Sequence, residues 1–582
     1  MAISTTLSEV VDSAIRPGDP GLSVGIYTDG KLIHQASAGL ASVEFEAPVD
    51  TRTRFDIASM SKQFTAAAAL LLCRDGRLSL DDDIRTHLPE LKLAVPVTVG
   101  QCLRHTGGLR DWLALATIAG RPLTRITQDQ TLAFVAGLTE VDFEPGTAFS
   151  YSNTGYVLVA SLVRRLTGRT LGEFTTDRMF TPLGMNETVF REDSREPLPR
   201  FAYGYDVTRG AVRRADTEES AVGDGGLATS VADLAPWFGF LQDGRVLGAD
   251  IRDGLLRQVD SGDGQEWPYA LGLYHTTIAG HPAFGHAGGV PGYRSQLLFM
   301  PDADLGVALL SNNSSIDSAE LATRVLRLAA GLPEDDPVAL TADPVAAEPA
   351  ARLTGDWLDP RSGLTLRIDA VGNGRIRIHD APSAGEFAPA VDGSWQGLED
   401  SAGFWLRVSS GTIRIGSVYR PGRATEYRRC PPAAAGATLP PAVYRSPELG
   451  VLATVTRDGT LELGLEFVGT IEPAPDGAFR AGGLISLRPS GDDLLISTHG
   501  VHRMRFLRQP DDTAPLGLPP GLDLVPLRPL AGHTTPRPAV AGPERQLPPT
   551  GTTHVFPAGE QATADGESTG ERRGPMPRSE RR

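Results

Sequence analysis

The chain has 582 residues, of which 41% are apolar and 22% charged, and its formal net charge is −16. This composition is typical of a soluble globular protein, and the length predicts roughly two to four domains. The net negative charge argues against nucleic acid and anionic membrane surfaces as partners. The cysteines Cys73, Cys102 and Cys430 are too few and too scattered for a disulfide framework or a metal site.

Targeting signals are not evident in the sequence. Residues 1–20 lack a basic region followed by an apolar run, and no apolar stretch is long enough to span a bilayer. We therefore expect a cytoplasmic protein without a membrane partner. The Pro-rich segment 509–582 cannot bury a core, and we expect it to be a disordered tail.

The first elements along the chain are a helix and a strand pair. Ser8–Ile15 has the spacing of a short amphipathic helix. Leu22–Tyr27 and Leu32–Ser37 are predicted strands, and Asp29-Gly30 between them favours a hairpin turn. This order, continued by helices and then by further strands, predicts an antiparallel sheet with helices packed on it.

Further along the first 335 residues, the sequence again predicts a helix and a pair of strands. A helix is predicted at Gly155–Arg165, and Ser295–Met300 with Leu305–Leu310 forms a second strand pair. The fold class is therefore α+β, with one catalytic-sized domain over residues 1–335.

The most informative stretch is the predicted buried helix around Met60–Leu72, whose first turn carries Ser59 and Lys62. Residues three apart on a helix share a face, so the amine of Lys62 can reach the hydroxyl of Ser59. A serine hydroxyl is a weak nucleophile until a neighbouring base activates it. The alternative is an N-capping serine beside a solvated lysine.

Composition favours the catalytic interpretation of this pair. Lys31, Lys62 and Lys92 are the only lysines in a chain that has 55 lysines and arginines together. Arginine keeps its proton in proteins, whereas a desolvated lysine can act as a neutral base. A lysine retained at position 62 indicates that its deprotonation matters.

Other polar residues precede buried elements and complete a candidate site. Tyr151 and Asn153 stand on a short loop that enters a helix, and His286 lies in a glycine-rich stretch near a strand edge. We expect Tyr151 to shuttle a proton, Asn153 to hold Lys62 or a substrate carbonyl, and His286 to complete the relay or orient the substrate.

An oxyanion needs hydrogen-bond donors, and the backbone N–H groups of Ser59 and Gly289 are the candidates. The loop His105–Trp112 is interpreted as a connection between helices in preference to a catalytic element.

Beyond a Pro- and acid-rich linker at 336–350, the chain changes to short strands. Residues 351–432 and 433–508 both begin with an aromatic residue, a polar turn and a Gly-led strand, and both end in an Arg- and aromatic-rich strand. We interpret them as two copies of a small antiparallel β-barrel.

Three short motifs resemble those of the serine beta-lactamase and penicillin-binding-protein-like superfamily, over about residues 10–330. They are Ser59-Met60-Ser61-Lys62, Tyr151-Ser152-Asn153 and His286-Ala287-Gly288. The histidine of the third motif and the two appended barrels are similar to the D-aminopeptidase branch. The resemblance implies that Ser59 is acylated, that Lys62 and Tyr151 transfer protons, and that Asn153, His286 and Gly288 contact the substrate.

The chain departs from that branch in its last barrel. In D-aminopeptidases a long loop of this barrel reaches the substrate amine, whereas here only residues 488–493 join two predicted strands. Asp492 or Asp493 is the residue of this short loop that we expect to pair with an ammonium group.

We therefore expect a serine hydrolase that acts through an acyl-enzyme on a small peptide, amide or ester, with an N-terminal D-residue as the preferred substrate. An esterase or beta-lactamase/DD-peptidase-like hydrolase is the first alternative, and a non-catalytic binding protein on the same fold is the second. No cofactor or metal is expected, and a homodimer is among the expected assemblies.

Overall fold

The structure is a computed structural model of the chain. It describes residues 2–120, 126–208, 210–215, 219–261, 267–333, 350–379, 381, 383–398, 401, 403–417, 424–434, 436–464, 467–482 and 485–510, which all belong to one compact unit. The linker predicted at 336–350, except residue 350, and the tail predicted at 509–582, except residues 509 and 510, lie outside them.

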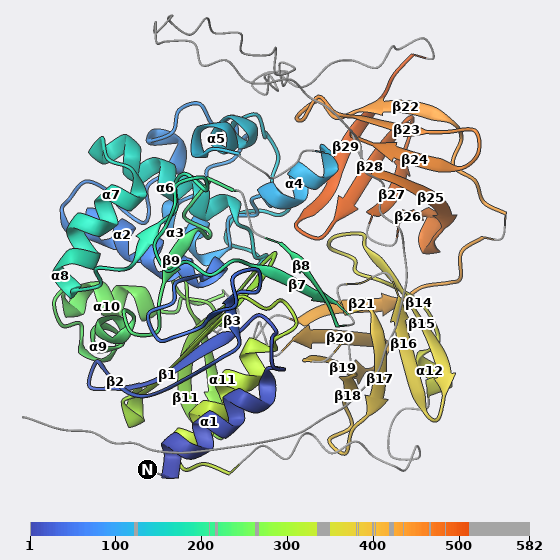
Figure 1. The fold of residues 1–582 in the computed structure, drawn as a ribbon. Coiled ribbons are helices and arrows are strands. Elements are labelled where there is room, and N and C mark those ends of the chain that lie inside the picture. The colour runs from blue at the N-terminus through green and yellow to red at the C-terminus, as the bar shows by residue number, and fades with distance from the viewer. Residues whose placement is uncertain are drawn as a thin grey trace, which may run out of the picture. The chain divides into compact units, whose positions relative to one another are not determined.

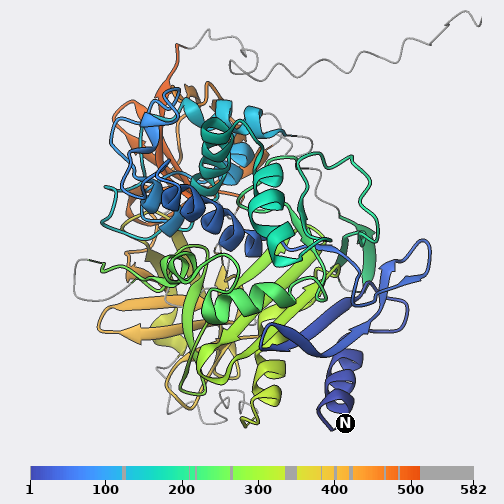
Figure 2. The ribbon, with the colours of Figure 1, turned by 90° about the vertical axis from the view of Figure 1, so that its left-hand side faces the viewer.

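A six-stranded antiparallel sheet forms the centre of the first 333 residues, in the order β10-β11-β12-β13-β1-β2. The N-terminal hairpin and the C-terminal strands meet where β1 pairs with β13, and Figure 2 shows the blue hairpin beside these greener strands. The strands are β1 (Leu22–Thr28), β2 (Lys31–Ala38), β10 (Tyr274–Ile278), β11 (His281–Val290), β12 (Tyr293–Met300) and β13 (Leu305–Ser311). The predicted hairpin and the predicted strand pair are both confirmed.

Two helices cover one face of the sheet. Helices α1 (Ala2–Ala14) and α11 (Ser318–Ala329) lie side by side (Figure 1) and share a core with Leu298 and Met300 of β12. The alternate residues Leu297 and Phe299 belong to the main core instead. This alternation is what a strand buried on both faces requires.

The other helices build the part of the molecule that contains Ser59. They are α2 (Lys62–Arg74), α3 (Val99–Arg104), α4 (Trp112–Ile118), α5 (Gln128–Ala136), α6 (Thr154–Thr167), α7 (Leu171–Thr175), α8 (Thr181–Leu183), α9 (Ala235–Asp243) and α10 (Ala249–Leu256). Three small sheets complete it, from β3 (Leu40–Ser42) with β4 (Ala47–Pro48), β5 (Phe55–Asp56) with β9 (Leu227–Thr229) and β6 (Val189–Phe190), and β7 (Tyr205–Thr208) with β8 (Ala211–Arg214).

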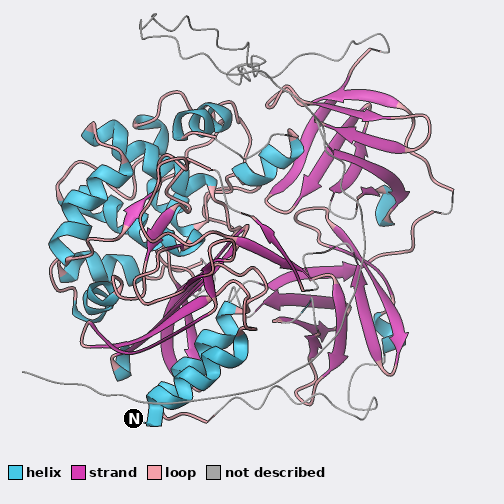
Figure 3. Cartoon of the chain, in the orientation of Figure 1, coloured by secondary structure: helices cyan, strands magenta, loops and turns pink. Residues whose placement is uncertain are grey.

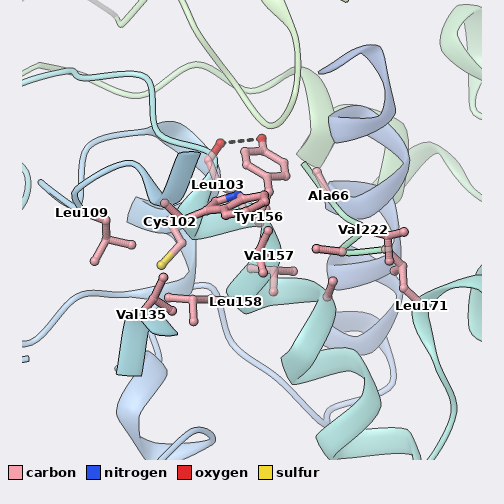
Figure 4. Packing of buried hydrophobic residues seen from close by; sticks show 14 of the residues in the cluster. Ala66, Cys102, Leu103, Leu109, Val135, Tyr156, Val157, Leu158, Leu171 and Val222 are labelled. Carbon is pink, nitrogen blue, oxygen red and sulfur yellow. Dashed lines mark hydrogen bonds between the residues drawn. The ribbon is translucent and has the colours of Figure 1, made fainter. Parts of the chain in front are cut away.

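Helices α2, α3 and α6 share one apolar core beneath the candidate site. Residues of α2 from Lys62 to Leu72 are all buried. Tyr156, near the start of α6, is fully buried and donates a hydrogen bond to the carbonyl of Leu103 at 2.7 Å (Figure 4). A hydrogen bond satisfied inside an apolar cluster fixes the orientation of α6 against α3.

The two predicted barrels are confirmed as closed barrels of eight antiparallel strands, which Figure 3 shows as two groups of magenta strands. The first consists of β14 (Gly355–Leu358), β15 (Thr365–Gly372), β16 (Arg375–His379), β17 (Gly385–Pro389), β18 (Trp395–Gly397), β19 (Phe404–Ser409), β20 (Thr412–Ser417) and β21 (Ala424–Arg429), preceded by α12 (Ala350–Leu353). The second consists of β22 (Ala442–Arg445), β23 (Leu452–Val455), β24 (Thr460–Leu463), β25 (Phe467–Pro473), β26 (Phe479–Ala481), β27 (Ile485–Ser490), β28 (Asp493–Thr498) and β29 (Val501–Arg508). Closure leaves neither barrel with an open sheet edge.

The second barrel is joined to the helical region through Glu448. Its carboxylate accepts hydrogen bonds from the N–H groups of Thr139 and Glu140 at 2.7 and 2.9 Å and from the Thr139 hydroxyl at 2.8 Å. It also pairs with the buried guanidinium of Arg110, which contacts Asp142 on its other side. Charged groups at this depth are stable only because each has several partners.

Across the described part of the chain, no helix is long and apolar enough to cross a membrane.

We predict that Glu448→Ala lowers the free energy of unfolding by about 2–4 kcal/mol, because the variant leaves Arg110 and two backbone N–H groups short of acceptors. Urea denaturation followed by tryptophan fluorescence measures the loss. The control Glu462→Ala, at an exposed position of β24, should change stability by no more than about 0.5 kcal/mol. Equal losses in the two variants would contradict the anchoring role of Glu448.

Candidate active site

Ser59 lies in a 3₁₀ turn, Ala58–Ser61, that runs directly into α2. Ala58 has a φ of 50°, a conformation that costs a non-glycine residue about 1–2 kcal/mol. The side chain of Asp56 stabilises the turn by accepting the N–H of Ala58 at 2.8 Å. Residues three apart eclipse one another in a 3₁₀ helix, so this turn places Ser59 and Lys62 on the same side.

The amine of Lys62 is at the centre of the site, and the whole side chain is buried. Its Nζ lies 3.0 Å from Ser59 Oγ, 2.8 Å from Asn153 Oδ1 and 2.6 Å from the carbonyl oxygen of Asp224. The same nitrogen is 4.9 Å from the centre of the Tyr151 ring. The structure thus brings together Ser59, Lys62, Tyr151 and Asn153, as the sequence predicted.

The acceptors of Lys62 are held in place by the start of α4. Asp111 caps this helix and also accepts the N–H of Asn153 at 2.6 Å through its Oδ2. Trp112 donates its indole N–H to Asp224 Oδ2 at 2.8 Å. The segment that the sequence indicated as a mere helix connection therefore positions two of the three groups around the amine.

His105, like Asp111 and Trp112, contacts the site although the sequence interpretation gave it no role there. It ends α3 in the left-handed conformation, with a φ of 61°, and its Nδ1 accepts the N–H of Ser152 at 3.1 Å. Its ring lies against that of Tyr151, with the ring centres 4.2 Å apart. The sequence did contain a signal, since a histidine before Thr-Gly-Gly is suited to a left-handed helix end.

His286 was expected near a strand edge, where it would complete the relay or orient the substrate. It lies within β11, is only 3% exposed and is absent from the cavity wall described below. Its Nε2 is 3.0 Å from the hydroxyl of Tyr269 and its Nδ1 is 2.5 Å from the carbonyl of Ala287. With Tyr269 it forms a layer behind Tyr151, and its contact with a substrate stays a prediction.

The hydroxyls of two fully buried tyrosines, Tyr156 and Tyr269, are poor candidates for proton transfer. Burial raises the pKa of both Tyr156 and Tyr269 well above the ordinary value of 10.0. Tyr151, by contrast, lines the cavity beside Ser59. Proton transfer by Tyr151 therefore stays a prediction that its place in the cavity wall permits.

The glycines of the third motif have different roles. A Cβ at Gly288 would lie 2.2 Å from the carbonyl oxygen of Ile57 and 2.2 Å from Ser295 Oγ, so glycine allows β11 to pack against the turn that carries Ser59. Gly288 is thus a packing residue and not part of the cavity wall. Gly289 does line the cavity together with Ser59. Its N–H as an oxyanion donor remains a prediction.

A cavity of about 400 Å³ opens above these residues. Ser59, Tyr151, Asn153 and Gly289 line it, and so do His499 and Gly500 from the second barrel. The carbonyl of Gly500 accepts the N–H of Asp111 at 2.7 Å, which fixes this barrel turn against the site. A volume of this size fits a small ligand.

The barrel turn that reaches the cavity is not the one predicted. Asp492 and Asp493 lie at the β27–β28 turn, at the far end of β28 from His499, and the carboxylate of Asp493 pairs with Arg505 at 2.6 Å. A strand of six residues spans about 20 Å, which separates this turn from the cavity. The expectation that Asp492 or Asp493 contacts the substrate is therefore wrong, because the barrel presents its β28–β29 turn instead.

Four carboxyl groups line the cavity, namely Asp56, Asp111, Glu219 and Asp224. Burial raises the pKa of Asp224 above its ordinary value, although Lys62 acts in the opposite direction. Burial, followed by repulsion from the other three carboxylates, raises the pKa of Glu219 from 4.5 to about 8. The sequence interpretation did not include Glu219, because no local motif marks it.

A protein-family model described as Beta-lactamase matches residues 10–331, which is more than half of the chain. The chain belongs to the Beta-lactamase family. Within that family it is a serine hydrolase, as the three motifs indicated, and the geometry around Ser59 and Lys62 agrees with that class.

Relatives of this Beta-lactamase family member include curated D-aminopeptidases. One from Gluconobacter oxydans (strain 621H) is 31% identical over 374 residues, which are 63% of this chain and 68% of that protein. One from Brucella anthropi (strain ATCC 49188) is 30% identical over 366 residues, which are 62% of this chain and 67% of that protein. The branch named from the sequence motifs is thus supported.

A solved structure has a similar fold over a larger share of the chain. It is that of an octameric penicillin-binding protein homologue from Pyrococcus abyssi, with a TM-score of 0.53 and 23% identity over 73% of this chain and 99% of that one.

The raised pKa of Glu219 predicts a pH-dependent stability. A carboxyl group with a higher pKa in the folded state favours folding at low pH, and this contribution is lost as the pH rises through about 8. Between about pH 5 and pH 8, wild type should lose stability relative to Glu219→Gln, by at most about 1.4 kcal/mol per pH unit. Urea unfolding at several pH values measures the difference.

The control for this series is Glu196→Gln, at an exposed position outside the cavity, whose difference from wild type should stay constant with pH. A constant difference for Glu219→Gln as well would show that its carboxyl group titrates normally.

Proposed function

We propose that the chain is an aminopeptidase that releases N-terminal D-amino acids from small peptides, amides or esters through an acyl-enzyme on Ser59. The observation that carries the proposal is the buried amine of Lys62, bonded at once to Ser59, Asn153 and Asp224. The D-aminopeptidase relatives support the choice of substrate. The cytoplasm is the proposed compartment, and the three free cysteines agree with it.

The three contacts of Lys62 suit a base that faces one hydroxyl. A neutral amine has two N–H groups and one lone pair. Asn153 Oδ1 and the carbonyl of Asp224 are acceptors only, so they take the two N–H groups and direct the lone pair toward Ser59 Oγ. Lys62 then removes the serine proton as Ser59 attacks the substrate carbonyl.

The remaining steps use groups on the cavity wall. The negative charge that develops on the carbonyl oxygen is stabilised by the N–H groups of Ser59 and Gly289. Tyr151, next to Lys62, passes the proton to the leaving amine, which departs and leaves the acyl-enzyme. In the second half of the reaction, water attacks the acyl carbon while Tyr151 and Lys62 take its proton and return it to Ser59 Oγ. This step releases the amino acid.

We expect wild type to hydrolyse D-alanine p-nitroanilide faster than its L-enantiomer, and Ser59→Ala to lose this activity. Lys62→Arg places a permanently protonated side chain at this position, which cannot accept the serine proton, so kcat should fall by about 10²- to 10⁴-fold. Release of p-nitroaniline measures each rate, and circular dichroism checks the fold. The matched control Lys92→Arg, at an exposed position, should leave kcat unchanged.

A series with p-nitrophenyl acetate and nitrocefin separates this proposal from its alternative. Turnover of those two compounds without turnover of the D-anilide would assign the chain to an esterase or lactamase activity. Anilide hydrolysis that survives in Ser59→Ala would refute the mechanism itself.

A further inference from the structure

We infer that Glu219 binds the N-terminal ammonium group of the substrate and so selects substrates with a free amine. This inference rests on the proposed aminopeptidase function, and it names the residue that reads the amine in this chain. It also replaces the role that Asp492 and Asp493 do not fill.

The position of Glu219 is set by its backbone neighbours. The next residue, Ser220, donates its N–H to the carbonyl of Ile126 at 3.0 Å, and Val222 donates to Gln128 Oε1 at 2.9 Å. Both contacts attach the segment to the start of α5, while the side chain of Glu219 lines the same cavity as Ser59. The contacts of Ser220 and Val222, which follow Glu219 in the sequence, therefore hold Glu219 at the cavity.

Glu219 differs from the other acidic residues of the cavity, each of which accepts a hydrogen bond from a described residue. Asp56 accepts the N–H of Ala58, Asp111 caps α4, and Asp224 accepts the indole N–H of Trp112. Among the residues that the structure describes, none forms a hydrogen bond or an ion pair with the carboxyl group of Glu219. A half-buried carboxyl group without a protein partner, in the wall of a cavity, is free to accept hydrogen bonds from a ligand.

The charge balance of the cavity indicates what that ligand is. Four acidic residues line the cavity. The described cations around it are each engaged: Lys62 with Ser59 Oγ, Arg191 at 3.9 Å from Asp56, and Arg294 with the carbonyl of Val290 at 3.0 Å. Repulsion among these carboxylates contributes to the raised pKa of Glu219. A cation that enters the cavity relieves this repulsion and ionises Glu219.

An ammonium group fits better than a metal ion. Within the described ranges, no group of three or more His, Cys, Asp or Glu residues is arranged to hold a metal. An ammonium needs fewer acceptors, because it donates three hydrogen bonds that carboxylate and carbonyl oxygens can share. The amine of an aminopeptidase substrate also lies one carbon from the carbonyl that Ser59 attacks, so it must enter this same cavity.

The test compares two substrates in Glu219→Gln, which keeps the size of the side chain and removes its charge. D-Alanine p-nitroanilide carries the ammonium group, and p-nitrophenyl acetate does not. We expect the ratio of kcat/KM for the anilide to kcat/KM for the acetate to fall by about tenfold to a hundredfold, mainly through a higher KM for the anilide. Glu196→Gln, exposed and outside the cavity, should keep the wild-type ratio.

The outcomes are distinct. If the anilide-to-acetate ratio of kcat/KM is unchanged in Glu219→Gln, the assignment is overturned. The same holds if both values of kcat/KM fall equally, as damage to the variant would cause. Fluorophosphonate labelling of Ser59 and the variant Glu219→Asp, which keeps the charge and should restore much of the ratio, separate charge from folding. Wild type that hydrolyses the acetate but not the anilide refutes the aminopeptidase function, and the role of Glu219 with it.

Discussion

The candidate active site of this chain depends on holding one lysine amine out of water beside a serine hydroxyl. Burial alone would make such an amine unstable, because it has three positions to satisfy and no solvent to satisfy them. The structure supplies three oxygens, from Ser59, Asn153 and Asp224, which come from three distant parts of the chain. Much of the surrounding structure can be understood as the means of bringing these oxygens to one point.

Two local devices serve that purpose. The strained turn at Ala58 brings Ser59 and Lys62 to the same side of the first helical turn, and Gly288 lets β11 press against the backbone of that turn. The start of α4 then ties the other two oxygens together, since Asp111 holds Asn153 and Trp112 holds Asp224. Strain at one residue is thus repaid by packing and hydrogen bonds around it.

The second barrel belongs to the site as well as to the fold. Its Glu448 completes the charge network of the buried Arg110, and its turn at His499 and Gly500 closes one side of the cavity next to Asp111. Arg110, which pairs with Glu448 of the barrel, is followed directly by Asp111, which accepts the N–H of Asn153. One short segment therefore contacts both the barrel and the candidate site. The barrel turn adds no carboxylate to the cavity, so the acidic wall comes from the catalytic region.

The sequence by itself determined the α+β class, the hairpin, the two barrels and the group formed by Ser59, Lys62, Tyr151 and Asn153, because periodicity and spacing are local properties. Only the tertiary structure decided the rest. His105, Asp111 and Trp112 contact residues that lie far away along the chain, and Glu219 lines a cavity built from distant segments. No local pattern marks such positions. For the same reason the Asp492–Asp493 turn was misplaced, because which end of a barrel strand meets the cavity depends on how the barrel packs against the helices.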